Sequence, residues 1–142
     1  MREVKRSALV SQPPARVYAL INDIERYPEF VPWCTHARVL ARSAAEIVAT
    51  LGVRQGALSG EFTTRNVLEP ERAVHMHLVS GPFRTLEGEW RLAPIEAHGC
   101  RVEFTVRFEF RSRISAVLFE GLFAHTVGSL VDAFVQRARA LP

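Results

Sequence analysis

The stretch that decides the fold lies at the C-terminal end of the sequence: RVEFTVRFEF at residues 101–110, then RSRISAVLFEGLFAHTVGSLVDAFVQRARAL at 111–141. In the first segment every second residue is apolar, which predicts a strand with one buried face. In the second segment apolar residues recur at helical spacing, so we predict a helix from Ser115 to about Leu141. Gly121, Ala124 and Gly128 fall outside its apolar arc. A long helix beside such a strand indicates a sheet whose apolar face the helix covers.

Working outward, the same two-residue period continues upstream to the N-terminus, interrupted by one short helical stretch. Pro13 and Pro14 suit the first turn of a helix at 14–22, whereas Pro28 and Pro32 restrict residues 24–33 to a helical turn or a structured loop. Short polar connections make the strands antiparallel, and Gly60 is one of two strand glycines where the sheet could bend, Gly88 being the other. The predicted strands cover residues 4–10, 36–42, 46–53, 58–68, 73–80, 84–93 and 101–110.

These elements predict an α+β fold of the helix-grip type. A curved antiparallel sheet of six to seven strands would wrap around the C-terminal helix, with short helices after the first strand. The length of 142 residues fits one domain spanning 1–142. No uninterrupted apolar run reaches the roughly 18 residues of a membrane span, and the two cysteines suggest a reduced, cytoplasmic chain. The net charge of +3 is spread along the sequence, which favours a solvated surface and no DNA partner.

Catalytic and metal-binding motifs are missing from the sequence. It has no glycine-rich phosphate loop and no HExxH. His75 and His77 share one strand face without a third metal ligand, and Cys34 has no basic partner nearby in the sequence, so we expect no metal, no cofactor and no catalytic residue. Arg137 lies within the apolar arc of the long helix, where it could pair with a polar ligand group or extend toward solvent. A sheet and a helix with large apolar side chains can instead leave a pocket between them.

Several local motifs resemble the coenzyme Q-binding protein/RatA family of START-like, polyketide cyclase-like proteins. The resemblance covers nearly the whole chain and includes Phe134, Arg137 and Ala138 of the last helix. The motifs that carry it are Tyr27-Pro28-Glu29-Phe30-Val31-Pro32-Trp33-Cys34, Phe62-Thr63-Thr64-Arg65-Asn66, Ser80-Gly81-Pro82-Phe83-Arg84, Gly88-Glu89-Trp90 and Cys100-Arg101-Val102-Glu103-Phe104.

The resemblance implies two functions. One is non-enzymatic binding of ubiquinone or another polyprenyl lipid in a sheet–helix tunnel, in support of respiratory electron transport. The other is a RatA-type toxin that binds the large ribosomal subunit and blocks its association with the small subunit. That second function would require a cluster of arginines such as Arg38, Arg54, Arg65 and Arg84 on one face. A third hypothesis, a cyclase or hydratase, would require polar groups inside the cavity. The only polar residues whose position in the strand or helix period points them toward the interior are Thr64, Asn66 and Thr126.

We favour the lipid-binding function, because a dry interior between sheet and helix is the one volume that this chain could offer an isoprenoid tail. Phe30, Val31 and Pro32 are expected at its mouth, as a lid or in contact with a membrane surface, which leaves open a peripheral position at the inner membrane. The ligand itself would be a hydrophobic small molecule. The predicted tunnel residues are Trp33, Phe62, Met76, Leu78, Trp90, Phe104, Leu122, Phe123, Thr126 and Leu130.

Overall fold

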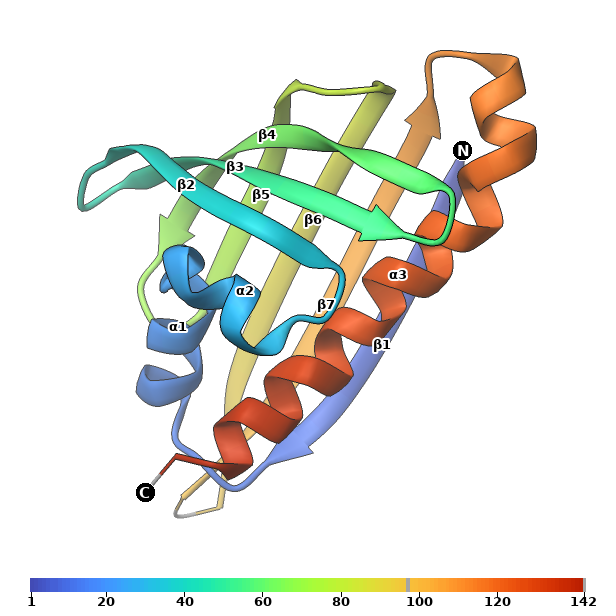
Figure 1. Ribbon diagram of the computed structural model, residues 1–142. Coiled ribbons are helices and arrows are strands. Elements are labelled where there is room, and N and C mark those ends of the chain that lie inside the picture. The colour runs from blue at the N-terminus through green and yellow to red at the C-terminus, as the bar shows by residue number, and fades with distance from the viewer. Residues whose placement is uncertain (97, 142) are drawn as a thin grey trace.

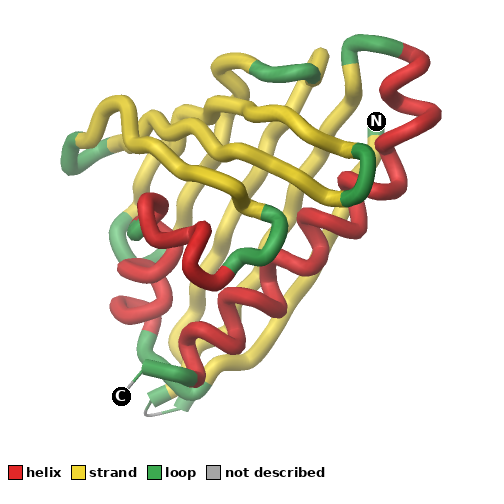
Figure 2. Tube along the Cα trace, in the orientation of Figure 1, coloured by secondary structure: helices red, strands yellow, loops and turns green. Residues whose placement is uncertain are grey.

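Seven antiparallel strands form one sheet in the order β1-β7-β6-β5-β4-β3-β2, as Figure 1 shows for the computed structural model. The structure describes residues 1–96 and 98–141. In Figure 2, β2, β3 and β4 bend out of the plane of the other strands, so that the sheet wraps around α3. The elements are β1 (Arg2–Val10), α1 (Pro14–Asn22), a 3-10 turn η1 (Ile24–Arg26), α2 (Tyr27–Phe30), β2 (Cys34–Arg42), β3 (Glu46–Gln55), β4 (Leu58–Glu69), β5 (Ala73–Ser80), β6 (Phe83–Ile95), β7 (Gly99–Phe110) and α3 (Arg113–Arg139).

The predicted helix-grip architecture is therefore confirmed, with seven strands. The alternation read from 101–110 appears as strict alternation of burial along β7, from Cys100 to Phe110. The long helix begins two residues earlier than Ser115. Its N-cap is Ser112, whose side-chain oxygen accepts a hydrogen bond from the backbone N–H of Ser115 at 3.2 Å. Ser115 is thus inside the first turn, where its free N–H is satisfied by the cap.

The prolines at 28 and 32 divide the segment between α1 and β2 into short pieces. Pro28 occupies the first turn of α2, and the backbone N–H of Val31 closes that turn on the carbonyl of Tyr27 at 2.8 Å. Pro32 then follows where the chain is no longer helical, before β2 begins at Cys34. The structure thus resolves the open alternative for residues 24–33 in favour of two helical turns, η1 and α2.

The strand pairing has several register shifts, and none of them falls at Gly60 or Gly88. Pairing is continuous through Gly60, opposite Val53, and through Gly88, between Met76 and Val106. The register instead shifts near Cys34–Ala37, Val39–Ala41, Thr63–Thr64 and Phe83–Thr85. A bulge adds a residue to one strand and increases its local twist. Three of these shifts involve β2 or β4, which curve over α3, and the fourth lies at the start of β6.

One face of α3 was misassigned from its sequence. Ala124 and Gly128, predicted outside the apolar arc, are buried. β1, at the edge of the sheet, runs along this face, and the Arg6 guanidinium lies where a side chain at Gly128 would begin, 2.8 Å from that Cβ position. Small residues therefore allow the edge strand to approach the helix closely. Gly121, on the same stripe, has no neighbour within 4 Å of its Cβ position.

Among the described residues, α3 alone has the length and apolar composition of a membrane-spanning helix. Its composition has a different explanation here. Phe123, Val127, Leu130 and Phe134 are buried against the concave face of the sheet. The apolar character of these four positions is accounted for by core packing.

Candidate functional site

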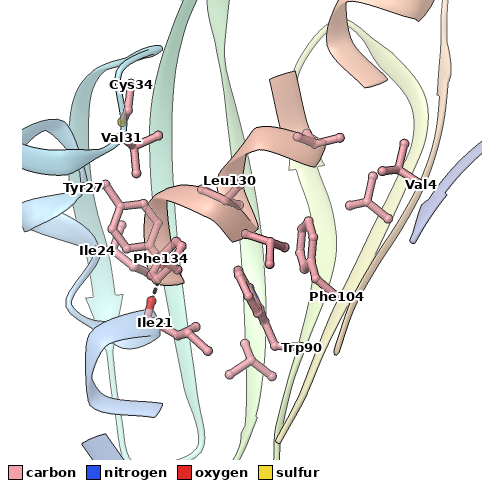
Figure 3. Close-up of a cluster of buried hydrophobic side chains, with 14 of the residues drawn as sticks. Val4, Ile21, Ile24, Tyr27, Val31, Cys34, Trp90, Phe104, Leu130 and Phe134 are labelled. Carbon is pink, nitrogen blue, oxygen red and sulfur yellow. Dashed lines mark hydrogen bonds between the residues drawn. The ribbon is translucent and has the colours of Figure 1, made fainter. Parts of the chain in front are cut away.

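Two groups of aromatic rings fill the interior between the sheet and α3. The phenylalanine cluster comprises Phe62, Phe83, Phe108, Phe110 and Phe123, with the centroids of contacting rings 4.8–6.3 Å apart. The mixed aromatic cluster comprises Tyr27, Phe30, Trp90, Phe104 and Phe134, with centroids 4.3–5.9 Å apart. Figure 3 shows part of the second group, with Tyr27, Trp90 and Phe104 converging beside Leu130.

A cavity of about 50 Å³ lies between the two clusters. It has room for a water molecule or two, since a water occupies about 30 Å³ in the liquid, and it is far smaller than the roughly 150 Å³ cavity that holds a benzene ring. Its wall is almost entirely apolar. The lining residues are Ile24, Tyr27, Trp33, Ala49, Leu51, Phe62, Thr64, Asn66, Met76, Leu86, Trp90, Phe104, Val106, Phe123, Val127 and Leu130.

Seven of the ten predicted tunnel residues lie in this wall. The other three lie elsewhere: Thr126 is buried with its hydroxyl donating to the carbonyl of Leu122 at 2.8 Å, and Leu78 and Leu122 are half-buried at the margin of the core. Helical geometry explains Thr126, because that hydrogen bond turns the hydroxyl back onto its own helix. The seven are Trp33, Phe62, Met76, Trp90, Phe104, Phe123 and Leu130.

The predicted lid residues do not line the cavity themselves. Val31 is only 1% exposed, Pro32 is exposed, and Phe30 is half-buried against Tyr27 and Phe134. The lining residues contributed by this segment are Ile24, from η1, and Tyr27, from α2. Ile24 and Tyr27 therefore bring η1 and α2 to the cavity wall, and a lid or membrane-facing role for Phe30, Val31 and Pro32 stays a prediction.

The polar side chains of the wall include a hydrogen-bonded pair on β4. Thr64 and Asn66 are both buried, and the Thr64 hydroxyl donates to the side-chain oxygen of Asn66 at 2.8 Å. Two residues apart on one strand, they face the same side. Thr64 and Asn66 follow Phe62 at intervals of two residues, and this spacing is what predicted from the sequence that both side chains point inward.

No carboxylate, imidazole, thiol or amine belongs to the described residues of the wall. Tyr27 is the one titratable group there. Its hydroxyl donates to the carbonyl of Ile21, the dashed line in Figure 3, and burial raises its pKa far above the usual value. The indole N–H of Trp33 is also buried, without a hydrogen-bond partner in the described part of the chain. The wall can therefore bind and orient an apolar ligand, and it offers no group to move a proton near neutral pH.

The segment η1–α2 is held against α3 mainly by side chains. Arg137 donates from Nη2 to Glu29 Oε1 at 3.0 Å, and its guanidinium lies 5.0 Å from the centre of the Phe30 ring. Arg137 is thus satisfied by α2 and solvent rather than aimed into the cavity. Tyr27 and Phe30 pack edge-on against Phe134, also on α3.

The remaining candidates from the sequence do not form a reactive site. Burial raises the pKa of the Cys34 thiol to about 11, so the thiol is protonated and unreactive at neutral pH. His75 and His77 lie on the outer face of the sheet, next to Glu69, Glu89 and Glu87. No group of three or more potential metal ligands occurs within residues 1–96 and 98–141.

The sequence of the chain matches a known protein family. Residues 10–135 match the family model described as polyketide cyclase / dehydrase and lipid transport. The chain belongs to this family. Among curated relatives, the ribosome association toxin RatA of Vibrio cholerae is 41% identical over 139 residues, which is 98% of this chain and 96% of that protein. The mitochondrial coenzyme Q-binding protein COQ10 homolog B of Xenopus laevis is 27% identical over 96% of this chain, and the match covers 57% of that longer protein.

Solved structures show the same polyketide cyclase-like fold. The ZhuI aromatase/cyclase of a Streptomyces species superposes with a TM-score of 0.87 over 97% of this chain and 93% of that one, at 18% identity. At that identity the likeness concerns the fold alone. An 18 kDa protein of Caulobacter crescentus, known from its solution structure, is 28% identical with a TM-score of 0.76 over 98% of this chain and 97% of that one.

Proposed function

We propose that this member of the polyketide cyclase and lipid transport family binds a hydrophobic ligand between the sheet and α3 and carries it without changing it chemically. Ubiquinone or another polyprenyl lipid is the proposed ligand, with a role in respiratory electron transport. The observation that carries the proposal is the cavity between the two aromatic clusters, whose wall is apolar except for Thr64, Asn66 and the polar atoms of Tyr27 and Trp33. Each Å² of apolar ligand surface buried there would contribute about 25 cal/mol to binding.

Because the cavity is small, binding of the proposed ligand requires part of the cavity wall to move. A quinone ring does not fit in about 50 Å³, so the ligand has to separate some of the wall from the rest. The part of the described wall outside the sheet and α3 is the η1–α2 segment together with Trp33, which lies between α2 and β2. Displacement of the η1–α2 segment would leave the hydrogen bonds of the seven-stranded sheet intact, and we propose it as the route of ligand access.

The non-enzymatic part of the proposal is supported by the chemistry of the wall. An aromatase or cyclase moves protons at its substrate, and this needs a positioned acid or base. The described wall supplies Thr64, Asn66 and a tyrosine whose pKa is raised by burial. These groups suit a hydrogen bond to a ligand carbonyl or hydroxyl.

The test is organic extraction of the protein after expression in a quinone-producing bacterium, with mass spectrometry of the extract. We expect stoichiometric quinone from the wild type. Ala49→Leu, which fills the cavity, should lower the amount at least about ten-fold, because the added methylenes occupy the volume of the ligand. Ala133→Leu, at a half-buried position of α3 outside the wall, is the matched control and should retain quinone. Equal retention by both variants, or an empty wild type that also fails to take up added ubiquinone, would contradict the proposal.

A second candidate function is binding to the large ribosomal subunit, favoured by the 41% identity to proteins named ribosome association toxin RatA. Arg38, Arg54 and Arg84 are exposed and have no ion-pair partner in the described part of the chain, whereas Arg65 pairs with Glu46 at 3.2 Å. Co-sedimentation with isolated large subunits over a salt series tests this. Arg38→Gln with Arg54→Gln should weaken binding and flatten its salt dependence, and binding that is absent at low salt would exclude this function.

A further inference from the structure

The first turns of α3 carry large apolar side chains that nothing in the fold covers. Ile114, Val117 and Leu118 are 73%, 81% and 63% exposed. Spaced by three and four residues, they share one face of the helix. One turn later on that face, Gly121 has open space around its Cβ position. We call Ile114, Val117, Leu118 and Gly121 the helix-tip surface.

The same helix face is covered farther along the chain. At Gly128 the side chain of Arg6, from the edge strand β1, lies directly on the helix. Figure 1 shows the first turns of α3 standing clear of the sheet, while the later turns run along it. The helix-tip surface is therefore not a gap in the core. It is the outward face of the first turns of α3, whose other face packs against the core through Ala116 and Phe119.

Positive charge borders this surface. Arg113 directly precedes Ile114, Arg111 lies two residues before Arg113, and both arginines are exposed. Arg111 donates from Nε to the carbonyl of Phe83 at 3.1 Å, which brings the start of β6, with the exposed Arg84, to the same end of the molecule. No ion pair involves these three arginines in the described part of the chain, and the neighbouring carboxylates, Glu109 and Glu120, are half-buried.

We propose that the helix-tip surface docks on a membrane that contains anionic phospholipids. The aliphatic side chains would enter the boundary between headgroups and acyl chains, and the guanidinium groups would contact lipid phosphates. A second copy of the chain fits less well, because a few exposed side chains fall short of the roughly 800 Å² per partner of a stable interface. Arginines at the rim also complement phosphate rather than one another. The inference does not depend on the cavity ligand.

Vesicle flotation with the full chain tests the proposal. We expect the wild type to float with phosphatidylglycerol/phosphatidylcholine vesicles and to float less with phosphatidylcholine alone. Val117→Glu with Leu118→Glu should lower the fraction bound at least about ten-fold, since two exposed aliphatic groups are lost and two negative charges are added. Arg84→Gln with Arg113→Gln should reduce the preference for anionic vesicles.

The matched control is Leu9→Glu with Leu40→Glu, two leucines that are 62% and 57% exposed on the strands β1 and β2. Circular dichroism checks that each variant is folded, and the control should float like the wild type. The proposal is overturned if the wild type does not float, or if the control loses as much binding as the helix-tip variant. A concentration-dependent dimer that Val117→Glu with Leu118→Glu abolishes, seen by gel filtration, would overturn it in favour of self-association.

Discussion

The two aromatic clusters on either side of the cavity are built from different kinds of element. The phenylalanine cluster draws its rings from β4, β6, β7 and α3, so every ring is fixed by a long strand or by the long helix. The mixed aromatic cluster takes Tyr27 and Phe30 from α2, which has four residues. An isolated helix of that length is not stable in water, so α2 depends on its side-chain contacts with the rest of the fold.

This difference suggests that the two clusters have different roles when a ligand binds. The phenylalanine cluster would keep the sheet on α3, and the mixed aromatic cluster would separate when a ligand enters. Both clusters contribute to the cavity wall, through Phe62 and Phe123 on one side and Tyr27, Trp90 and Phe104 on the other. Displacement of α2, which carries Tyr27 and Phe30 of the mixed aromatic cluster, would break side-chain contacts but few backbone hydrogen bonds.

The largest expected effect is on the stability of the phenylalanine cluster. Phe108 is fully buried, so Phe108→Ala should lower the free energy of unfolding by about 3–5 kcal/mol. Phe30→Ala, at a half-buried ring of the mixed cluster, should cost about 1 kcal/mol. Urea denaturation followed by circular dichroism measures both. Equal losses would mean that the two clusters do not differ in the way their elements suggest.

A smaller effect should appear in the pH dependence of stability. Burial raises the pKa of Cys34, just beyond the η1–α2 segment, from its usual 9.0 to about 11. Between these two pH values the folded chain keeps the thiol proton and the unfolded chain has lost it, so the free energy of unfolding falls as the pH rises.

Cys34→Ala should remove this contribution and make the decline between pH 9 and pH 10 shallower by up to about 1 kcal/mol. Tyr27 and Cys100, whose pKa values are also raised by burial, act in the same direction in both proteins and cancel in the comparison. Urea titrations of wild type and variant at pH 7, 9 and 10 provide the measurement. Parallel pH profiles would show that the thiol is accessible to water in the folded state.

Periodicity was sufficient to predict the sheet, since alternation such as that of residues 101–110 reports directly which face is buried. It also placed seven tunnel residues on the cavity wall, because strand phase and helix phase fix which side chains point inward. The sequence did not reveal what covers the stripe of Ala124 and Gly128. That depends on which strand forms the sheet edge beside α3, a long-range fact that local spacing does not contain.

The volume of the cavity could not be predicted from the sequence either. Whether facing apolar side chains leave a tunnel or close to about 50 Å³ depends on their rotamers and on small shifts of the wall. The pairing of Arg137 with Glu29 joins residues 108 positions apart and has no sequence signature. An arginine within an apolar arc signals only that some partner has to exist.

The smallest expected effect on stability concerns this pair. Glu29 is half-exposed, so the pair should contribute less than about 1 kcal/mol, and Arg137→Gln should leave the urea midpoint almost unchanged. The same change loosens α2 from α3, and the amide of Val31, which closes α2 on Tyr27, should exchange with solvent several-fold faster.

Hydrogen exchange followed by NMR separates the two effects, with the amide of Phe104 in the paired strand β7 as internal control. A Glu29→Gln variant should reproduce most of the faster exchange at Val31, and the double variant should add little to Arg137→Gln, because both single changes remove the same ion pair and only Arg137→Gln also removes the guanidinium from the Phe30 ring. If Val31 and Phe104 exchange faster together, the interior opens as one unit with the sheet. If Val31 alone responds, the mixed aromatic cluster opens while the phenylalanine cluster stays closed, and ligand access through η1–α2 follows from the weakness of a single exposed ion pair.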